Sequence, residues 1–517
     1  MARLDLDALT LGAVRDGALA GRRATVLGLA RTGTGLARFL VDAGAVVTVY
    51  DRKPEAELGP AIDSLEGRPI ALRVGPEADP AEAWGEADLV AFSPSTTPGF
   101  PTMEPRLRQA LDALAARVAA GDPAAPALVS EPDLFLRLCP APTVGITGTK
   151  GKTTTASLAH ALLAADPSHA VIFGGNVGRP LVDRLDEITP AGRVVIELSE
   201  LQLPSLSRGT TVAVYTNVTA DHLDRHGSLE AYRRVKRRLA ELVDHDGALV
   251  LNLEDPVVAS YAALGRVPVI GYRLERPIPG GVGLVDGWVV AAGVERLPVA
   301  GGGPAAVGPG GRVMPAAELA LPGRHNLANL LAAVGVALLF GVAPDAIRGA
   351  AGAFPGVEHR LEPIAAVDGV LFVNDSQGTQ PDAVIAALRA FGPPLVLIAG
   401  GRDKGVDLSP LAPVVAERAA AAVLIGESAP ALGRLFRDAG LARVEDAGSL
   451  AAAVPRAAAI ARELLAASGR TEGAIVLLSP AAASFDQFVD YAARGRAFRE
   501  AVASLAADRA REAEGTR

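Results

Sequence analysis

The stretch TVGITGTKGKTTTASLAHALL, residues 143–163, constrains the fold more than any other part of the chain. An apolar run, a glycine-rich turn and an apolar run with helical spacing follow one another, which predicts a strand, a loop and a helix. Lys152 and Thr153 follow Gly151 as they do at the end of a phosphate-binding P-loop. The strict P-loop pattern has glycine where this chain has Ile146. The stretch therefore indicates a variant phosphate loop, and the alternative is a glycine turn before an ordinary helix.

Composition excludes several classes of protein. The net charge of −8 argues against a general nucleic-acid binder, whose surface is basic. A single cysteine, Cys139, excludes internal disulfides and cysteine-based zinc sites. No run reaches the roughly 20 apolar residues needed to span a bilayer, and the acidic N-terminal segment does not resemble a signal peptide. We therefore expect a cytoplasmic protein that neither inserts into membranes nor binds nucleic acid.

A chain of 517 residues is too long for one core, so we expect several domains. Residues 22–54 have the strand, glycine turn, helix and strand order that opens a Rossmann-like domain, with Asp51 at the end of the second strand. Residues 115–142 are rich in Pro and Ala, which predicts loose structure in places and a domain boundary near the end of this stretch. Residues 280–311 predict hairpins or an insertion. Alternating strand and helix patterns then predict an α/β chain with domains at 1–140, 141–355 and 356–517.

The segment GITGTKGKTT, residues 145–154, resembles the ATP loop of the Mur ligases, which join an amino acid to a UDP-linked muramic acid precursor of peptidoglycan. Further segments match the family in the same order: 174–178, 197–203, 216–236, 323–326, 358–362 and 374–381. Two more, at 400–411 and 477–495, favour the members that add D-glutamate to UDP-N-acetylmuramoyl-L-alanine. Any one segment would be weak, but nine in order are specific.

The resemblance implies the three-domain Mur ligase architecture. A Rossmann-like N-terminal domain holds the UDP substrate, a central P-loop ATPase-like domain holds ATP, and a C-terminal Rossmann-like domain holds the amino acid. It also implies a monomer that uses ATP and two Mg²⁺ ions and makes an amide through an acyl phosphate and a tetrahedral intermediate. Such chemistry needs positioning and charge neutralisation more than covalent help from the protein.

For the phosphates and the metal ions, the resemblance assigns residues in the loop and beyond it. Lys152, Lys236, His222 and Glu197 are the expected catalytic residues, and Thr153, Ser199, Glu197, His222 and Lys236 the expected metal set. Family members carry a lysine carbamylated by CO₂ at the place of Lys236. Composition alone predicts an exposed surface lysine there, because it lies in a basic helical run. The ATP contacts would be Gly148, Thr149, Lys150, Gly151, Lys152, Thr153, Thr154, Asn326, Arg360, Asn374 and Asp375.

For the two other substrates, the resemblance assigns residues at both ends of the chain. The UDP precursor would contact Gly28, Arg31, Thr32, Gly33, Asp51, Arg52 and Asn176. D-glutamate carries two carboxylates and therefore needs hydrogen-bond donors in two places, each worth about 1.5–3 kcal/mol. The donors would be Thr379, Lys404 and Ser484, with Tyr491 closing the pocket.

Several positions depart from the family pattern. Gln377 and Gln380 stand where lysine and asparagine are usual, so one positive charge is absent near the amino-acid site. These changes leave open a ligase that uses L-glutamate or another amino acid. An NAD-dependent oxidoreductase, based on residues 24–54, is a different class, but Ala30 breaks its fingerprint. A catalytically inactive nucleotide-binding regulator is a third class, which predicts a broken phosphate or metal set.

Overall fold

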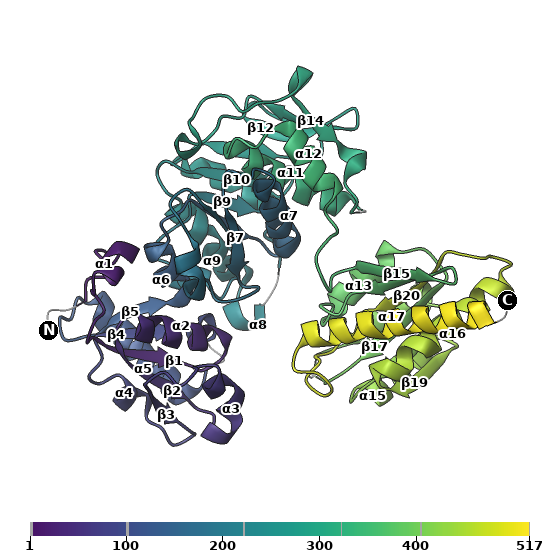
Figure 1. Ribbon diagram of the computed structural model, residues 1–517, viewed down its shortest axis with the longest axis horizontal. Coiled ribbons are helices and arrows are strands. Elements are labelled where there is room, and N and C mark those ends of the chain that lie inside the picture. The colour runs from purple at the N-terminus through teal and green to yellow at the C-terminus, as the bar shows by residue number, and fades with distance from the viewer. Residues whose placement is uncertain (1–3, 100–102, 221–222, 322, 404–405, 516–517) are drawn as a thin grey trace. The chain divides into compact units, whose positions relative to one another are not determined.

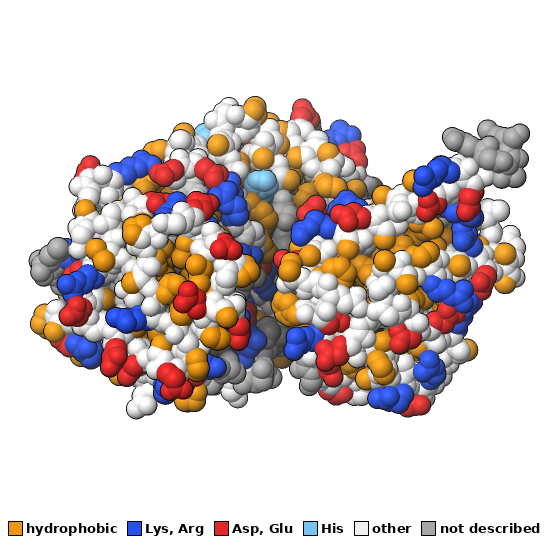
Figure 2. All heavy atoms as spheres, turned by 60° about the horizontal axis from the view of Figure 1, so that its bottom comes forward, with side chains coloured by type: hydrophobic (Ala, Val, Ile, Leu, Met, Phe, Trp, Pro, Cys, Tyr) orange, Lys and Arg blue, Asp and Glu red, His pale blue; other side chains and the backbone are white. Residues whose placement is uncertain are grey.

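The computed structural model describes residues 4–99, 103–220, 223–321, 323–403 and 406–515. The chain divides into two compact units, Met1–Phe354 and Pro355–Arg517 (Figure 1). The first unit holds two sheets and the second unit holds one, and helices cover the sheets in α/β fashion. Among the described residues, no helix combines the length and hydropathy that a membrane span requires. Basic and acidic side chains are interspersed over the face shown in Figure 2.

The first sheet is parallel throughout, with the strand order β3-β2-β1-β4-β5. Its strands are continuous apolar runs because both faces are covered. Leu36, Ala37 and Leu40 of α2 pack on one face and Leu107, Leu111 and Leu114 of α5 on the other. The elements are β1 Arg23–Leu27, β2 Val46–Asp51, β3 Ile70–Val74, β4 Leu89–Phe92, β5 Ala127–Ser130, α1 Leu11–Arg15, α2 Arg31–Asp42, α3 Glu55–Asp63, α4 Pro80–Ala83 and α5 Pro105–Ala119.

The second sheet has nine strands in the order β14-β13-β12-β11-β10-β9-β6-β8-β7. Strands β6 to β12 pair in parallel, and β12, β13 and β14 add the hairpins expected for residues 280–311. The elements are β6 Thr143–Thr147, β7 Val171–Gly175, β8 Arg193–Glu197, β9 Val212–Tyr215, β10 Ala248–Asn252, β11 Val269–Tyr272, β12 Gly281–Val285, β13 Trp288–Ala292, β14 Arg312–Pro315, α7 Lys152–Ala164, α8 Leu223–His226, α9 Leu229–Leu242, α10 Pro256–Ser260, α11 Arg324–Leu339 and α12 Pro344–Gly352.

The third sheet forms the second unit, with the order β15-β16-β20-β17-β18-β19 and only β15 antiparallel. Two separate apolar clusters cover its faces, one with α13, α14 and α15 and one with α16 and α17. The elements are β15 Glu362–Val367, β16 Val370–Asn374, β17 Leu395–Gly400, β18 Ala421–Ile425, β19 Val444–Gly448, β20 Ala474–Leu478, α13 Pro381–Ala390, α14 Leu411–Arg418, α15 Ala429–Asp438, α16 Leu450–Ala467 and α17 Tyr491–Gly515.

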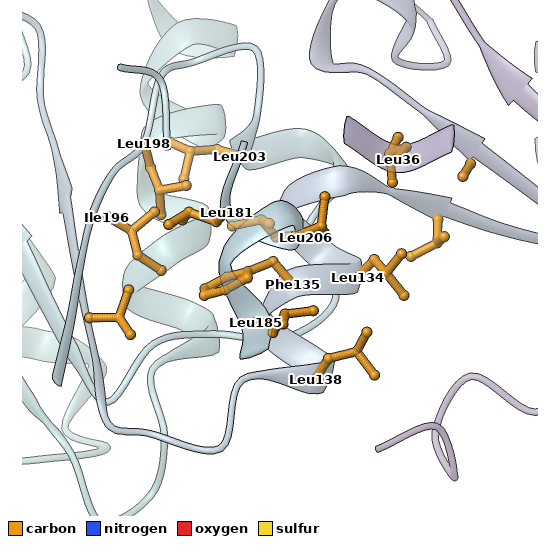
Figure 3. Packing of buried hydrophobic residues seen from close by; sticks show 14 of the residues in the cluster. Leu36, Leu134, Phe135, Leu138, Leu181, Leu185, Ile196, Leu198, Leu203 and Leu206 are labelled. Carbon is orange, nitrogen blue, oxygen red and sulfur yellow. The ribbon is translucent and has the colours of Figure 1, made fainter. Parts of the chain in front are cut away.

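The expectation of loose structure within residues 115–142 holds only for residues 120–126 and 139–142 and is wrong for the rest. This stretch completes α5 and then forms β5 and the helix α6, Glu131–Leu138, which Ser130 caps by accepting from the N–H of Asp133. Three apolar residues of α6 are fully buried with side chains from α2, β8 and two 3₁₀ turns, Leu181–Glu187 and Leu203–Ser205 (Figure 3). Burial of Leu134, Phe135 and Leu138 thus joins the first two sheets into one unit. The Pro-rich composition of this stretch does not indicate that α6 has this packing role.

Glu131 opens α6 with a buried carboxyl group. Its Oε1 accepts the backbone N–H groups of Leu181 at 3.1 Å and Val182 at 3.3 Å. Burial raises the pKa of Glu131 from 4.5 to about 7, and the two N–H bonds only partly oppose the rise. Below about pH 7 the folded unit therefore keeps this carboxyl protonated.

We expect Glu131→Gln to stabilise the protein at high pH and not at low pH. Between pH 4.5 and about 7 the unfolded chain ionises this group while the folded chain keeps the proton. The wild type therefore loses stability as pH rises, by an amount on the order of 3 kcal/mol, and keeps it fully below pH 4.5. Glutamine accepts the same two N–H bonds and cannot ionise. Thermal unfolding of both proteins at pH 4.5 and pH 8 measures the difference.

Glu187→Gln, at the exposed end of the same 3₁₀ turn, is the matched control. Arg184 lowers the pKa of the Glu187 carboxyl, so this substitution should give no gain at pH 8. An equal shift of the Glu131→Gln midpoint at both pH values would contradict the assignment.

Candidate active site

A glycine-rich loop joins the end of β6 to the start of α7. Its first glycine, Gly148, has φ +150°, and a Cβ there would lie 1.9 Å from Thr216 Oγ1. Only glycine fits, because L residues rarely adopt this backbone conformation and the side chain would have no space. Ile146, which replaces the first glycine of the strict pattern, lies inside β6 and is fully buried. The loop is therefore shorter than the strict pattern and begins after the strand ends.

The segment after β9 holds this loop in place. Asn217 accepts the N–H of Thr149 through its carbonyl oxygen at 2.8 Å and the N–H of Lys150 through Oδ1 at 2.9 Å. Thr216 Oγ1 donates to Lys150 O at 2.6 Å. The Thr149 hydroxyl lies 3.0 Å from the hydroxyl of Tyr232 on α9. These bonds use the N–H groups of Thr149 and Lys150, so the first turn of α7, with Thr153 and Thr154, retains the N–H groups that can face an anion.

Two lysines donate to this loop at the same carbonyl. Lys152 Nζ lies 3.0 Å from Gly148 O and 2.9 Å from Thr149 O. Lys236 Nζ lies 2.9 Å from Gly148 O and 3.3 Å from Thr147 Oγ1. The loop thus gathers two ammonium groups at the carboxyl end of β6, where a phosphate oxygen would be a stronger acceptor than a neutral carbonyl.

Lys236 is fully buried, at 0% exposure, so the expectation of an exposed surface lysine is wrong. The basic residues beside it, Arg233, Arg234 and Arg237, are exposed, as the composition predicted. Its ammonium group also lies 5.5 Å from the ring centroid of Tyr232. Burial of an ammonium group costs free energy of folding unless charged or polar partners compensate for the lost water. Buried charged groups are therefore frequent at functional sites, which makes Lys236 a functional candidate on physical grounds.

Glu197 ends β8, the strand beside β6, and stands opposite Ile146 in the parallel register. Its side chain is 1% exposed. Oε1 accepts from Asn176 Nδ2 at 2.9 Å, but the buried Oε2 has no hydrogen-bond partner among the described residues. A buried carboxylate oxygen without a donor needs an explanation, and a bound cation supplies one.

Ser199 follows two residues later and is also buried. Its hydroxyl donates to Gln202 Oε1 at 3.0 Å, and its N–H donates to the same oxygen at 2.9 Å. The hydroxyl lone pairs remain available, so Ser199 and Glu197 present hard oxygen donors of the kind that Mg²⁺ prefers. The donor set fits a magnesium ion. Of the other predicted metal ligands, Thr153 and Lys236 lie at the phosphate loop, and His222 lies outside the described residues.

The predicted UDP loop lies between β1 and α2. A Cβ on Gly33 would stand 1.7 Å from Gly28 O, so the helix can approach the turn only without a side chain there. Asp51 holds the same turn, because its carboxylate accepts the N–H of Leu29 at 2.8 Å and of Lys53 at 2.9 Å. Helix α2 starts at Arg31 without a side-chain cap, which leaves its first N–H groups for an anion.

This loop reaches the second sheet through Arg31, whose Nη2 donates to Asn176 O at 3.4 Å. Asn176 is the residue that also orients Glu197. Thr32 is half-buried beside Arg31, and Arg52 is exposed next to Asp51. The structure thus connects the predicted UDP contacts to the predicted metal contacts within the first unit.

Asn326 lies at the start of α11 and connects to the phosphate-loop helix. Its Oδ1 accepts from Asn329 Nδ2 at 3.3 Å, and Asn329 Oδ1 accepts from Thr155 Oγ1 on α7 at 3.1 Å. The predicted ATP contact and the loop therefore share one short polar chain. Arg360, Asn374 and Asp375, the other predicted ATP contacts outside the loop, belong to the second unit.

In the second unit, Asn374 and Asp375 follow β16. Asn374 is fully buried, and its amide donates to His359 Nδ1, Glu362 Oε2 and Gly495 O at 2.9, 3.0 and 3.3 Å. Asp375 accepts from Ser479 Oγ at 2.6 Å and from the Leu361 N–H at 3.2 Å. Burial raises the pKa of Asp375 to about 6. Both side chains hold the chain around β16, while Arg360 is exposed.

The predicted amino-acid contacts surround the same end of this sheet. Ser484 is buried, Thr379 is half-buried, and Tyr491 is 37% exposed at the start of α17. Tyr491 accepts a long hydrogen bond, 3.5 Å, from Gln377 Nε2. Lys404 lies outside the described residues.

Arg494 positions these segments, and the sequence reasoning missed it. It is 1% exposed, and it donates to Ser376 Oγ at 3.0 Å, to Ser376 O at 2.9 Å and to the carbonyl oxygens of Ala482 and Ala483 at 3.2 Å. Burial lowers the pKa of its guanidinium to about 10. Arg494 lies in the matched segment 477–495, but only the fold shows that it joins the loops after β16 and β20 to α17.

Asn217, Tyr232 and Gln202 were also missed as side chains that hold the site, although they lie in the matched segments. Each acts on a predicted residue, Asn217 and Tyr232 on the phosphate loop and Gln202 on Ser199. Each of the matched segments contains several polar residues. The sequence alone does not indicate which of their side chains point toward the site.

Comparisons with known proteins match almost the whole chain. A family model described as the Mur ligase middle domain matches residues 146–337, and one described as the Mur ligase, glutamate ligase domain matches residues 359–482. A UDP-N-acetylmuramoylalanine--D-glutamate ligase of Symbiobacterium thermophilum is 36% identical over 488 residues, covering 93% of this chain and 98% of that protein. A protein of the same name from Anaeromyxobacter dehalogenans is 39% identical over 505 residues, covering 95% and 99%.

Solved structures agree on the fold. A UDP-N-acetylmuramate-alanine ligase from Thermotoga maritima is 18% identical, covers 94% of this chain and 100% of its own, and has a TM-score of 0.54. MurF from Acinetobacter baumannii is 14% identical, covers 92% and 96%, and has a TM-score of 0.53.

Proposed function

Because the chain belongs to the Mur ligase family, we propose that it joins D-glutamate to UDP-N-acetylmuramoyl-L-alanine with the energy of ATP. The names of the relatives, which align over nearly their full length, support the two substrates. One observation in the structure carries the ATP half of the proposal. Lys152 and Lys236 donate to the same loop carbonyl, in a turn whose first glycine no other residue can replace.

The reaction makes an amide from a carboxylate, which is a poor electrophile. The γ-phosphoryl group of ATP passes to the alanyl carboxylate and ADP leaves. The amine of D-glutamate then attacks the acyl phosphate carbonyl, which forms the C–N bond and a tetrahedral intermediate. The intermediate collapses to the amide as phosphate departs. The chain contributes by holding these groups in line and neutralising charge. In this proposal Lys152 and the first turn of α7, with Thr153 and Thr154, hold the phosphates.

Magnesium would be held by oxygen and nitrogen donors of Thr153, Glu197, Ser199, His222 and, if it is carbamylated, Lys236, and when bound it would neutralise phosphate charge. The unpartnered Oε2 of Glu197 supports this assignment. We further propose that Lys236 is carbamylated. Its neutral amine would add to CO₂ and release a proton, which replaces a buried cation with a carboxylate beside Lys152. The burial of Lys236 and its contact with Gly148 O support this step.

Residues 1–140, 141–355 and 356–517 are proposed as the domains for the UDP precursor, ATP and the amino acid. Strands β1 to β5, β6 to β14 and β15 to β20 fall within these three ranges, which supports the division. Gly28, Arg31, Thr32, Gly33, Asp51, Arg52 and Asn176 would contact the UDP precursor, and Thr379, Lys404, Ser484 and Tyr491 the D-glutamate. A cytoplasmic monomer is the proposed working form.

L-glutamate stays a second candidate, because the sequence departs from the family pattern at the predicted amino-acid site. Gln377 replaces the usual lysine, and its Oε1 is buried without a hydrogen-bond partner among the described residues. The altered side chain lies beside Tyr491, at the predicted amino-acid site. The oxidoreductase interpretation is set aside, since family membership accounts for the whole chain and not only for residues 24–54.

Phosphate release from ATP tests the function. The purified protein is supplied with Mg²⁺ and UDP-N-acetylmuramoyl-L-alanine, and D- and L-glutamate are added in separate reactions. We expect release with D-glutamate only. Release with L-glutamate only would assign a stereochemical variant, and release with neither would refute the substrate assignment. Tight ATP binding without any release would instead favour the inactive regulator.

A further inference from the structure

The second sheet has a cavity at the edge away from the phosphate loop. It has a volume of about 320 Å³ and is lined by Pro142 before β6, by Arg193 at the start of β8, and by residues that follow α7, β13 and α11. Strand β6, five residues or about 16 Å long, separates Pro142 from the loop glycines. The cavity is therefore distinct from the proposed ATP site, and nothing in the proposed reaction uses it.

Arg193 lies in the wall of this cavity and is 4% exposed. Its Nη2 donates to Asp166 Oδ2 at 3.1 Å and to Phe340 O at 3.2 Å, and its guanidinium stacks 5.2 Å from the Phe340 ring centroid. Its Nη1 is buried without a hydrogen-bond partner among the described residues. Burial lowers the pKa of the Arg193 guanidinium even though Asp166 opposes that change. The hydrogen bonds to Asp166 and Phe340 thus compensate only part of the free-energy cost of burying the Arg193 guanidinium.

Arg296, from the loop after β13, lies in the same wall. Its Nε is likewise buried without a partner in the described part of the chain. The cavity lining therefore contains two guanidinium groups and one carboxylate, Asp166, which already pairs with Arg193, and the half-exposed His169 adds no negative charge. The lining carries a net positive charge, and Arg193 Nη1 and Arg296 Nε are buried donor nitrogens without an acceptor among the described residues.

We propose that this cavity is a second binding site, for a small oxyanion that bears a phosphate or a carboxylate group. An oxyanion is the ligand that satisfies both arginines at once, because guanidinium groups bind such oxygens with charge-assisted hydrogen bonds. Each side chain gains its missing acceptor when it turns toward a group that fills the space. The volume lies at the lower end of the range for small-molecule pockets, so it admits more than a bare ion.

The site is placed to communicate with the ATP site. Helices α7 and α11 pack against each other (Figure 1). Helix α7 begins at Lys152, and Asn326 lies in the first turn of α11, so a proposed ATP contact stands at the start of each helix. Both end beside the cavity, at Asp166 and Phe340. Helix α7, with 13 residues, spans about 20 Å between the two sites.

Equilibrium dialysis of the full chain tests the proposal, with the phosphate loop first saturated by a non-hydrolysable ATP analogue and Mg²⁺. Radiolabelled inorganic phosphate and radiolabelled malonate are the probes, in separate arms. We expect one equivalent of at least one probe to bind. Arg296→Gln and Arg193→Gln should each weaken this binding tenfold or more, because a charged hydrogen bond is lost.

Arg312→Gln is the matched control, since Arg312 is exposed on β14 and stacks on Trp288 away from the cavity lining. It should bind the probe as the wild type does. Binding of phosphate but not malonate would identify a phosphate-bearing ligand, and the reverse a carboxylate. Absence of binding to the wild type, or unchanged binding in Arg296→Gln, would overturn the proposal. Arg296→Gln decides the matter even if Arg193→Gln fails to fold, because Arg296 is the less buried of the two.

Discussion

Lys152→Ala is expected to reduce ADP release by a hundredfold to a thousandfold or more. The ammonium group of Lys152 is held against the loop by two carbonyl oxygens, at 2.9 and 3.0 Å, and is thus already positioned for the phosphates. Removal of one preorganised charged donor from a transition state costs about this much. Steady-state ADP release at saturating substrates, with the thermal unfolding midpoint as a check of folding, measures it.

Arg234→Ala provides the control for this substitution, because it removes a cation from the exposed face of α9 and leaves the loop untouched. Its turnover should match that of the wild type. Near-normal turnover in Lys152→Ala would refute the assignment of the phosphate loop.

Lys236→Ala is expected to reduce turnover by a hundredfold or more and to abolish its dependence on CO₂. The wild type in CO₂-depleted buffer should lose activity and regain it with bicarbonate, because the proposed carbamate forms reversibly. Carbon-13 NMR of the wild type with labelled bicarbonate should give a carbamate signal that Lys236→Ala lacks. The signal separates a carbamate from a buried lysine that only supports the loop through Gly148 O.

The neighbouring substitution Arg237→Ala controls for changes to α9, since Arg237 is exposed and pairs with Glu241 at 3.0 Å. It should keep both the turnover and the carbamate signal. If the wild type gives no carbamate signal and keeps full activity in CO₂-free buffer, the carbamate is excluded. Lys236 would then be a structural cation.

The sequence predicted the elements of this fold well where local patterns decide them. The strand before Gly148 and the helix after Gly151 lie where the pattern indicates. Asp51 ends β2 as expected, and the hairpins of residues 280–311 are present. In each case the information is local, because an apolar run, a glycine or a turn acts on its immediate neighbours.

Prediction from the sequence failed where contacts with distant segments of the chain determine the structure. Residues 115–142 look loose because their Pro and Ala content is a local signal, but α6 is ordered by side chains from four other elements. Lys236 looks exposed because its neighbours are basic, yet one face of α9 turns it toward the phosphate loop. The roles of Asn217 and Arg494 depend on the segments that fold against them. Resemblance located the segments of the site, and only the structure identified the side chains that support them.

The shared core around α6 has a consequence for synthesis on the ribosome, where the chain emerges from its N-terminus. The first sheet is complete in sequence at Ser130, but the apolar face of α6 is covered by Leu181, Leu185, Ile196, Leu198, Leu203 and Leu206. Helix α6 of the nascent chain must therefore keep an open apolar face until those residues leave the ribosome. In the described part of the second unit, by contrast, both core clusters come entirely from residues after Phe354, so neither cluster waits for a segment outside the unit.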